Sequence, residues 1–206
     1  MSILMLYAES TSGEKILATK HGRAFCPFCK TVTIAKCGEI NPHHWAHESI
    51  KVCDEWFESE SKWHLHWKSL FPKEFIEVTI QKNEKRHRAD IIGYNGTVVE
   101  LQHSPISPTV INDRELFYEN MIWLFDMASK RHSFTRKAQI SETEFSFKWS
   151  YPRWSLIMCK KPLYFDFGTK KMLCVTKLAY SGGTGYYVDK NDFVLEHGGT
   201  PTETAT

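Results

Sequence analysis

Residues 88–104 read RADIIGYNGTVVELQHS, and this stretch decides the expected fold. Two runs rich in β-branched and apolar residues, 88–94 and 97–102, flank the dipeptide Asn95-Gly96. Such a dipeptide between two β-rich runs is a strong signal for a β-hairpin. The sequence therefore predicts two antiparallel strands joined by a tight turn.

The length of that turn decides which side chains share a face of the hairpin. A strict two-residue turn would pair Asp90 with Leu101 and send the carboxylates of Asp90 and Glu100 to opposite faces. A three-residue loop over 94–96, with Gly96 in a left-handed conformation, pairs Asp90 directly with Glu100. If the two carboxylates hold a metal ion together, the three-residue loop must be the real one.

The segments around the hairpin predict a mixed fold. Tryptophans and a leucine recur at helical spacing within 54–71, and a short β-rich run follows at 75–80. The Ser-Pro pair at 107–108 is typical of a helix start, so a second helix is expected up to about residue 120. The apolar run 121–127 then predicts a buried strand.

The C-terminal part is expected to be β-rich. Beyond residue 140 the chain is aromatic and β-like, and the glycine-rich stretch 181–185 (SGGTG) is expected to form a turn. The last residues are polar and small, with nothing to bury, so a disordered tail is expected over 196–206.

Composition places the chain among ordinary globular proteins. Of 206 residues, 42% are hydrophobic and 24% charged, and the net charge of +2 does not by itself indicate a nucleic-acid binder. Two stretches, 82–88 and 130–137, are locally basic, although a solvated surface would look the same. No apolar run approaches the roughly 20 residues that span a bilayer, and no export signal is apparent, so we expect a cytoplasmic protein without a membrane partner.

Cysteines and histidines near the N-terminus predict a structural zinc site. Cys26 and Cys29 form a Cys-x-x-Cys pair, and His44 and His47 follow after a β-like excursion, which gives the N/S set that Zn²⁺ favours. No βαβ pattern surrounds the cysteine pair, which disfavours a redox role. Other candidates for the last two ligands are His43, Cys37 and Cys53.

Carboxylates near the hairpin predict a second, catalytic metal site. Asp90 and Glu100 on neighbouring strands suit a hard cation such as Mg²⁺, which takes oxygen ligands and keeps several waters. The alternative is that both are strand-end charges on a solvated face. The two flanking helices add polar side chains one turn apart, namely Glu60, His64 and Lys68 in the first and Arg114 and Tyr118 in the second.

These motifs together resemble the competence protein CoiA-like nuclease family, and the order helix, three strands, helix, strand looks like the PD-(D/E)xK nuclease core. The resemblance covers residues 26 to about 127. Its motifs are CPFC (26–29), HWAH (44–47), S-x-x-H-x-x-x-K (61–68), RAD (88–90), ELQHSPIS (100–107) and R-x-x-x-Y (114–118).

The resemblance implies metal-dependent cleavage of nucleic-acid phosphodiester bonds. Asp90 and Glu100 would be Mg²⁺ or Mn²⁺ ligands, with His64 as a further ligand or as an orienter of the phosphate. Gln102 stands where the wider superfamily usually has a lysine, and it could orient the attacking water while Lys68 supplies positive charge. The residues expected to contact the nucleic-acid backbone are Arg88, Arg114 and Tyr118.

The expected architecture is therefore α/β (α+β). It comprises a zinc-ribbon-like module over 1–53, a nuclease core over 54–140, a β-rich extension over 141–195 and the tail. The expected function is a Mg²⁺- or Mn²⁺-dependent deoxyribonuclease with structural Zn²⁺ and DNA as its partner. Two alternatives stay open: an inactive DNA-binding accessory protein that keeps the fold, and a zinc-ribbon interaction module whose hairpin carboxylates are incidental.

Overall fold

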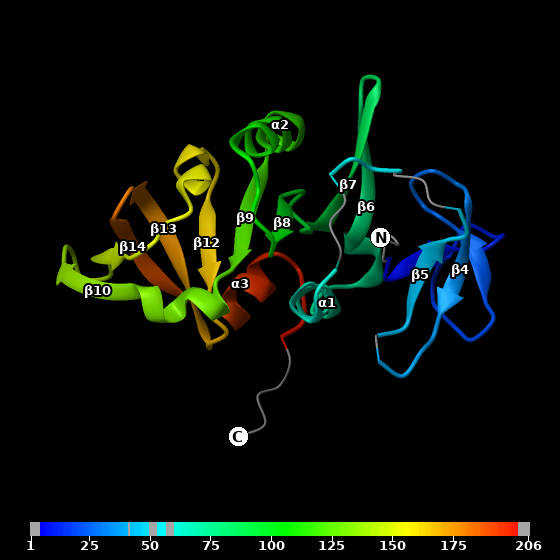
Figure 1. The fold of residues 1–206 in the computed structure, drawn as a ribbon, viewed down its shortest axis with the longest axis horizontal. Coiled ribbons are helices and arrows are strands. Elements are labelled where there is room, and N and C mark those ends of the chain that lie inside the picture. Colours follow the sequence, from blue (N-terminus) through cyan, green and yellow to red (C-terminus); the bar gives the residue numbers. More distant parts are fainter. Residues whose placement is uncertain (1–4, 41, 50–52, 57–59, 202–206) are drawn as a thin grey trace. The chain divides into compact units, whose positions relative to one another are not determined.

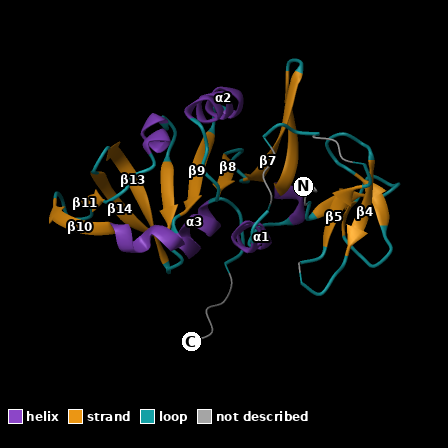
Figure 2. Cartoon of the chain, viewed as in Figure 1, coloured by secondary structure: helices purple, strands orange, loops and turns teal. Residues whose placement is uncertain are grey.

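The computed structural model describes residues 5–40, 42–49, 53–56 and 60–201 (Figure 1). The fold is mixed α+β and consists mostly of strands (Figure 2). The chain divides into two compact units, Met1–Ala89 and Asp90–Thr206, and each is described by itself. The module boundaries that we expect after residues 53 and 140 stay predictions. Within the described ranges, no helix combines the length and apolar character that crossing a bilayer requires.

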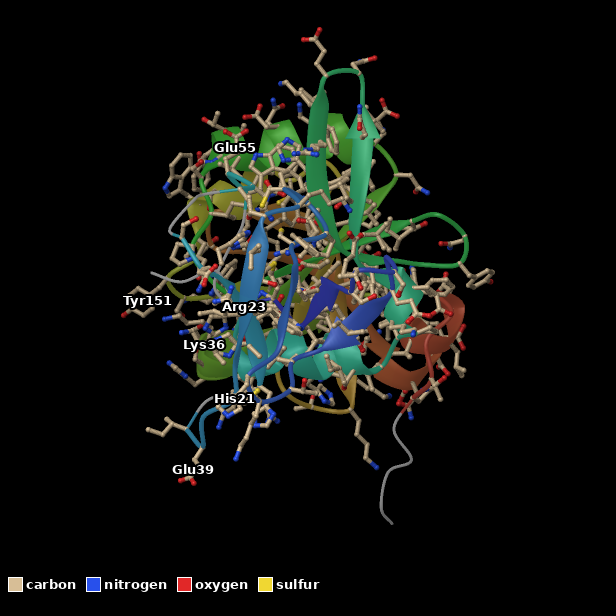
Figure 3. All side chains as sticks on the ribbon, turned by 90° about the vertical axis from the view of Figure 1, so that its right-hand side faces the viewer. His21, Arg23, Lys36, Glu39, Glu55 and Tyr151 are labelled. Carbon is tan, nitrogen blue, oxygen red and sulfur yellow. The ribbon has the colours of Figure 1, made fainter. Side chains whose placement is uncertain are left out.

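The first unit begins with a small antiparallel sheet in the order β2-β1-β3-β4-β5. Met5 and Trp45 exchange two backbone hydrogen bonds, which link the β5 edge back to the segment before β1. Figure 3 looks onto this unit and shows His21 and Glu39 at the opposite end from Glu55. The five strands are β1 (Tyr7–Glu9), β2 (Lys15–Leu17), β3 (Arg23–Phe25), β4 (Val32–Lys36) and β5 (His44–His47).

The helix of the first unit is shorter than the sequence pattern suggests. Helix α1 spans Lys62–Ser69, because Ser61 caps its N-terminus in a reciprocal capping box with His64. The tryptophan stripe is accordingly incomplete: Trp56 lies before the helix, and residues 57–59 lie outside the described residues. The 3-10 turn η1 (Lys73–Phe75), strand β6 (Ile76–Lys82) and strand β7 (Lys85–Ile92) follow, and β6 neighbours β7.

The second unit contains a sheet in the order β10-β11-β14-β13-β12-β9-β8-β7, to which β7 contributes its last three residues. Strands β8, β9 and β12 run parallel to one another, and every other pair of neighbouring strands in this sheet is antiparallel. The strands after β7 are β8 (Val98–Gln102), β9 (Met121–Asp126), β10 (Phe134–Gln139), β11 (Phe145–Trp149), β12 (Leu163–Asp166), β13 (Lys171–Ala179) and β14 (Gly182–Asp189). The helical segments are α2 (Pro108–Tyr118), η2 (Ala128–Ser133), η3 (Trp154–Met158) and α3 (Lys190–Glu196).

A β-α-β crossover forms the middle of this sheet, and its order of strand, helix and strand is the one that the sequence predicts. The parallel strands β8 and β9 are joined by α2 (Figure 1). Ser107 caps α2 by accepting a hydrogen bond from the Val110 N–H, and Pro108 occupies the first turn. The first five residues of β9 are buried, which explains the continuous apolar run at 121–125.

The β7–β8 hairpin has the three-residue loop. Ile91 pairs with Val99, and the Gly93 N–H donates to the Thr97 carbonyl at 2.8 Å. The Gly96 N–H donates to the Gly93 carbonyl at 2.8 Å, and Gly96 has φ of +77°. The loop over 94–96 with a left-handed glycine is therefore confirmed.

Gly96→Val is expected to destabilise the protein by about 1–2 kcal/mol, because a β-branched residue resists the left-handed backbone. A Cβ at this position would meet no atom within 4 Å, so the cost comes from the backbone alone. Denaturant unfolding measures it. Gly96→Asn is the matched control, since asparagine tolerates this conformation. Equal losses in both variants would contradict the assignment.

The turn that we expect at 181–185 lies at the start of that stretch: Tyr180 and Ser181 form the turn, and the glycines after it belong to strand β14. A Cβ at Gly183 would stand 2.1 Å from the Lys177 carbonyl oxygen, and one at Gly185 would stand 2.3 Å from the Cys174 carbonyl oxygen. Gly183 and Gly185 therefore permit close approach of the neighbouring strands.

The C-terminal end also differs from expectation. Residues 196–201 are described, and His197 is only 3% exposed because its ring lies 4.3 Å from that of Phe193. Its carbonyl accepts a hydrogen bond from the Tyr94 N–H. Only the part of the predicted tail over 202–206 lies outside the described residues.

Candidate metal and carboxylate sites

Four side chains of the first unit form a Cys₃His cluster. The ligand atoms of Cys26, Cys29, His47 and Cys53 all lie within 4.8 Å of one another. The Cys26 and Cys53 sulfurs are 4.0 Å apart, and the Cys29 sulfur lies 3.2 Å from His47 Nε2. A tetrahedral zinc with Zn–S bonds of about 2.3 Å places two sulfurs about 3.8 Å apart, so the spacing suits this ion.

The Cys53 thiol and the local backbone both favour the thiolate form of Cys26. Its thiol pKa is lowered to about 4, first by a hydrogen bond from Cys53 and then by the backbone N–H groups of Cys29 and Phe28. The same contact, together with burial, raises the pKa of Cys53. Lys30, with φ of +58°, completes the turn by donating its N–H to the Cys26 carbonyl at 2.9 Å. A thiolate in such a knuckle is the form that binds metal.

The fourth ligand corrects the preferred sequence prediction: Cys53, one of the other candidates in the sequence, takes the place of His44. Both histidines lie on β5, where side chains alternate between faces, so residues three apart point to opposite sides. His47 faces the cysteines, whereas His44 Nδ1 lies 2.8 Å from the Pro42 carbonyl oxygen. The His-x-x-His spacing would suit a helix or a loop, and the strand excludes it. The cluster could thus bind a structural metal such as zinc.

Asp90 and Glu100 lie together in the second unit. The register of Ile91 with Val99, continued by one residue, places them opposite each other. Glu100 Oε1 accepts the Asp90 N–H at 3.3 Å, and Asp90 Oδ2 accepts the Leu101 N–H at 3.0 Å. The two carboxylates therefore converge on one end of the hairpin.

Burial and charge act in opposite directions on Glu100. Its pKa is raised to about 7, mainly by burial and also by the charge of Asp90, although the guanidinium of Arg114 acts to lower it. Arg114 Nη1 donates to Glu100 Oε2 at 2.8 Å, and Glu100 is 2% exposed. A divalent cation beside the two carboxylates would compensate the charge that burial disfavours.

Gln102 and Tyr118 are also buried in this unit. Gln102 follows Glu100 by two residues on β8, so both side chains share a face. Its amide nitrogen donates to the Ser104 carbonyl at 2.9 Å, which fixes the orientation of the amide. Tyr118 is 4% exposed and packs edge-on against Phe117.

His64, Lys68 and Arg88, the other predicted site residues, belong to the first unit. Lys68 is 1% exposed and its ammonium group lies between two carboxylates, 2.5 Å from Glu60 Oε1 and 3.3 Å from Glu77 Oε1. Of the predicted polar stripe, His64 and Lys68 lie on α1, whereas Glu60 precedes the helix. The positive charge of Lys68 is balanced by the carboxylates of Glu60 and Glu77. His64 Nδ1 lies 2.9 Å from the Ser61 hydroxyl oxygen.

Glu77 is a buried residue that the sequence analysis missed. Its carboxylate accepts the N–H groups of Leu6 and Tyr7, both at 3.2 Å, although its own φ is +51°. Burial alone would raise its pKa, but the charges of Lys68 and Arg88 lower it overall. The β-rich run 75–80 gives no hint of this role, because the strand pattern alone predicts a solvated carboxylate.

Asp54 is a second missed residue, and it fixes the start of β7. Its carboxylate accepts the Arg88 N–H at 2.9 Å and lies 3.0 Å from His87 Nδ1. The His87 ring stacks on Trp56. The acidic stretch 54–60 therefore includes two buried carboxylates, Asp54 and Glu60.

Glu60→Gln is expected to flatten the pH dependence of stability. Burial, and then the charge of Glu77, raise the pKa of Glu60 to about 8, despite the opposing charge of Lys68. The folded state therefore keeps a proton that the unfolded state loses. The free energy of unfolding should fall as pH rises from about 4.5 towards 8, with a slope of up to about 1.4 kcal/mol per pH unit.

Thermal melts across this pH range measure the effect. Glutamine resembles the protonated side chain, so the variant should lose the decline. Glu55→Gln, at an exposed position, should keep it. Parallel curves for the wild type and Glu60→Gln would contradict the assignment.

Comparisons with protein-family models, curated proteins and solved structures gave no match.

Proposed function

We propose that the chain is a metal-dependent nuclease that hydrolyses DNA phosphodiester bonds at Asp90 and Glu100. The observation that supports this proposal is the convergence of these two carboxylates, one of them buried with its pKa raised to about 7. Mg²⁺ commonly binds proteins through one or two carboxylates and completes its shell with water and phosphate oxygens. The pair offers this donor set.

Each neighbouring residue has a part in the proposed reaction. A bound Mg²⁺ or Mn²⁺ would activate water and stabilise charge on the phosphate. Arg114 holds Glu100 through one oxygen at 2.8 Å and so fixes the direction of the other. Gln102, oriented by the Ser104 carbonyl, would position the attacking water. His64, Lys68 and Arg88 stay predictions for this reaction, and so does the PD-(D/E)xK core itself.

A second candidate is a DNA-binding protein that retains the fold without turnover. The contact between Arg114 and Glu100 favours it, since a buried ion pair already balances one carboxylate. Gln102 favours it as well, because a neutral amide supplies no positive charge to the reacting phosphate.

Incubation of the full chain with single-stranded and supercoiled DNA separates the two candidates. The nuclease predicts cleavage with Mg²⁺ or Mn²⁺ and none with EDTA. Retention of DNA on the protein without cleavage under any metal condition would favour the accessory protein. Absence of both cleavage and binding would refute both candidates.

A further inference from the structure

A hollow with an aromatic floor lies on the sheet of the second unit and is used by none of the sites above. The pocket has a volume of about 460 Å³. Its floor comes from β10, β11, β13 and β14, and its aromatic side chains are Phe134, Phe145, Phe147, Phe167 and Tyr187. We call it the basic-aromatic pocket.

Strand register explains why the floor is hollow. Phe145 lies opposite Gly185 and Phe147 opposite Gly183, so the two phenylalanines face positions without side chains. The close approach of neighbouring strands excludes a side chain at both glycines. The two phenylalanines therefore lie beside a stretch of backbone without side chains.

Tyr187 presents an aromatic surface to solvent. It is 47% exposed, and its ring centroid lies 4.9 Å from that of Phe145. Phe145 and Phe147 are only 2% and 5% exposed, so Tyr187 supplies most of the exposed aromatic surface among these three rings. Tyr187 is thus an exposed ring on a rigid sheet, which is the arrangement on which nucleic-acid bases stack.

Four cations line the same pocket. They are Arg131, Arg136, Lys170 and Lys171, and none of the residues that line the pocket is acidic. The Arg136 guanidinium lies 4.5 Å from the centroid of the Phe145 ring. Arg131 and Arg136 come from the basic stretch 130–137, whose role the sequence leaves open.

We propose that the basic-aromatic pocket binds a single-stranded nucleic-acid segment. A base stacks on Tyr187, and phosphates pair with Arg131, Lys170 and Lys171. Aromatic rings require an unstacked base, which a duplex does not offer, whereas the cations require a polyanion. The inference names the substrate class of the proposed nuclease and in that respect rests on the proposed function.

Binding of a fluorescein-labelled oligothymidylate to the full chain in EDTA tests the proposal. Fluorescence anisotropy should show that Lys170→Glu with Lys171→Glu weakens binding at least about tenfold and reduces the slope of log affinity against log salt by about 1.4. Tyr187→Leu should weaken binding at least about fivefold, through loss of stacking.

Matched controls lie on the opposite face of the same strands. Lys148 alternates with Phe147 on β11, and Tyr186 precedes Tyr187 on β14, so Lys148→Glu and Tyr186→Leu should keep wild-type affinity. Thermal melts establish that each variant is folded. Wild-type affinity in folded pocket variants, or equal losses in the controls, would overturn the proposal.

Competitors identify the ligand class. Unlabelled duplex and polyglutamate should displace the labelled strand poorly, and displacement by either one as efficient as by unlabelled oligothymidylate would overturn the assignment to single strands. Asp90→Asn separates this proposal from the nuclease. If the wild type binds the oligonucleotide but shows no metal-dependent cleavage, the nuclease proposal alone is refuted. If Asp90→Asn abolishes cleavage but the pocket variants bind as well as the wild type, the pocket proposal alone is refuted.

Discussion

Cys53→Ser is expected to reduce bound zinc from about one ion per chain to a small fraction of that and to unfold much of the first unit. The cluster supplies four donors, and a closed tetrahedral site contributes its binding free energy directly to folding. Elemental analysis measures the metal, and thermal melts with and without a chelator measure the stability. The effect should be large, because the small sheet around Trp45 and Met5 has few other buried large side chains among the described residues.

His44→Ala is the matched control for this prediction. His44 lies on the same strand as His47 but on the other face, so its loss should leave zinc content and the melt nearly unchanged. Loss of zinc from His44→Ala with retention in Cys53→Ser would restore the ligand set predicted from the sequence. Purified wild-type protein without zinc, with a melt indifferent to chelation, would contradict the site as a whole.

Asp90→Asn and Glu100→Gln are each expected to reduce the rate of metal-dependent cleavage by more than about a hundredfold. This loss is larger than the usual loss of activity when a residue that only hydrogen-bonds to a metal ligand is replaced. Each variant removes a carboxylate oxygen but keeps the side-chain shape. Cleavage of single-stranded DNA at saturating Mn²⁺ measures the loss, while oligothymidylate binding in EDTA should change little.

Asp113→Asn controls for the loss of a negative charge in the second unit, since Asp113 is exposed on α2. Its cleavage rate should equal that of the wild type. Wild-type cleavage activity in both Asp90→Asn and Glu100→Gln would exclude these carboxylates as the catalytic pair. This conclusion would not depend on whether the Cys₃His cluster binds zinc.

Local signals in the sequence predicted the hairpin and the order strand, helix, strand that follows it. Asn95-Gly96 predicted the position of the turn, whereas the choice of the three-residue loop, which brings Asp90 and Glu100 together, depended on the hypothesis of a shared metal ion. The Ser-Pro pair at 107–108 determined the start of α2. These features depend on interactions between residues that are close in the chain, and such interactions are visible in a single sequence.

Features that depend on distant residues could not be predicted in the same way. Cys53 joins Cys26 across 27 positions, and Glu77 receives the N–H groups of Leu6 and Tyr7 across about 70. The resemblance of HWAH (44–47) to the family motif favoured His44 over Cys53, because a motif does not show which face of a strand a residue occupies. The extent of the glycine-rich turn was misjudged for a related reason, since only the packing of Lys177 and Cys174 against β14 explains the glycines at 183 and 185.

The glycines of β14 limit which amino-acid substitutions the protein can tolerate at their positions. Gly182 and Gly183 lack room for even a methyl group, because its carbon would overlap a neighbouring carbonyl oxygen, and Gly185 is in the same position. In a library of all single substitutions, these positions should tolerate no replacement, as if they were core positions, although Gly183 is partly exposed. Mutational intolerance along β14 therefore would not by itself identify residues that touch a ligand, and Tyr187 has to be judged by binding instead.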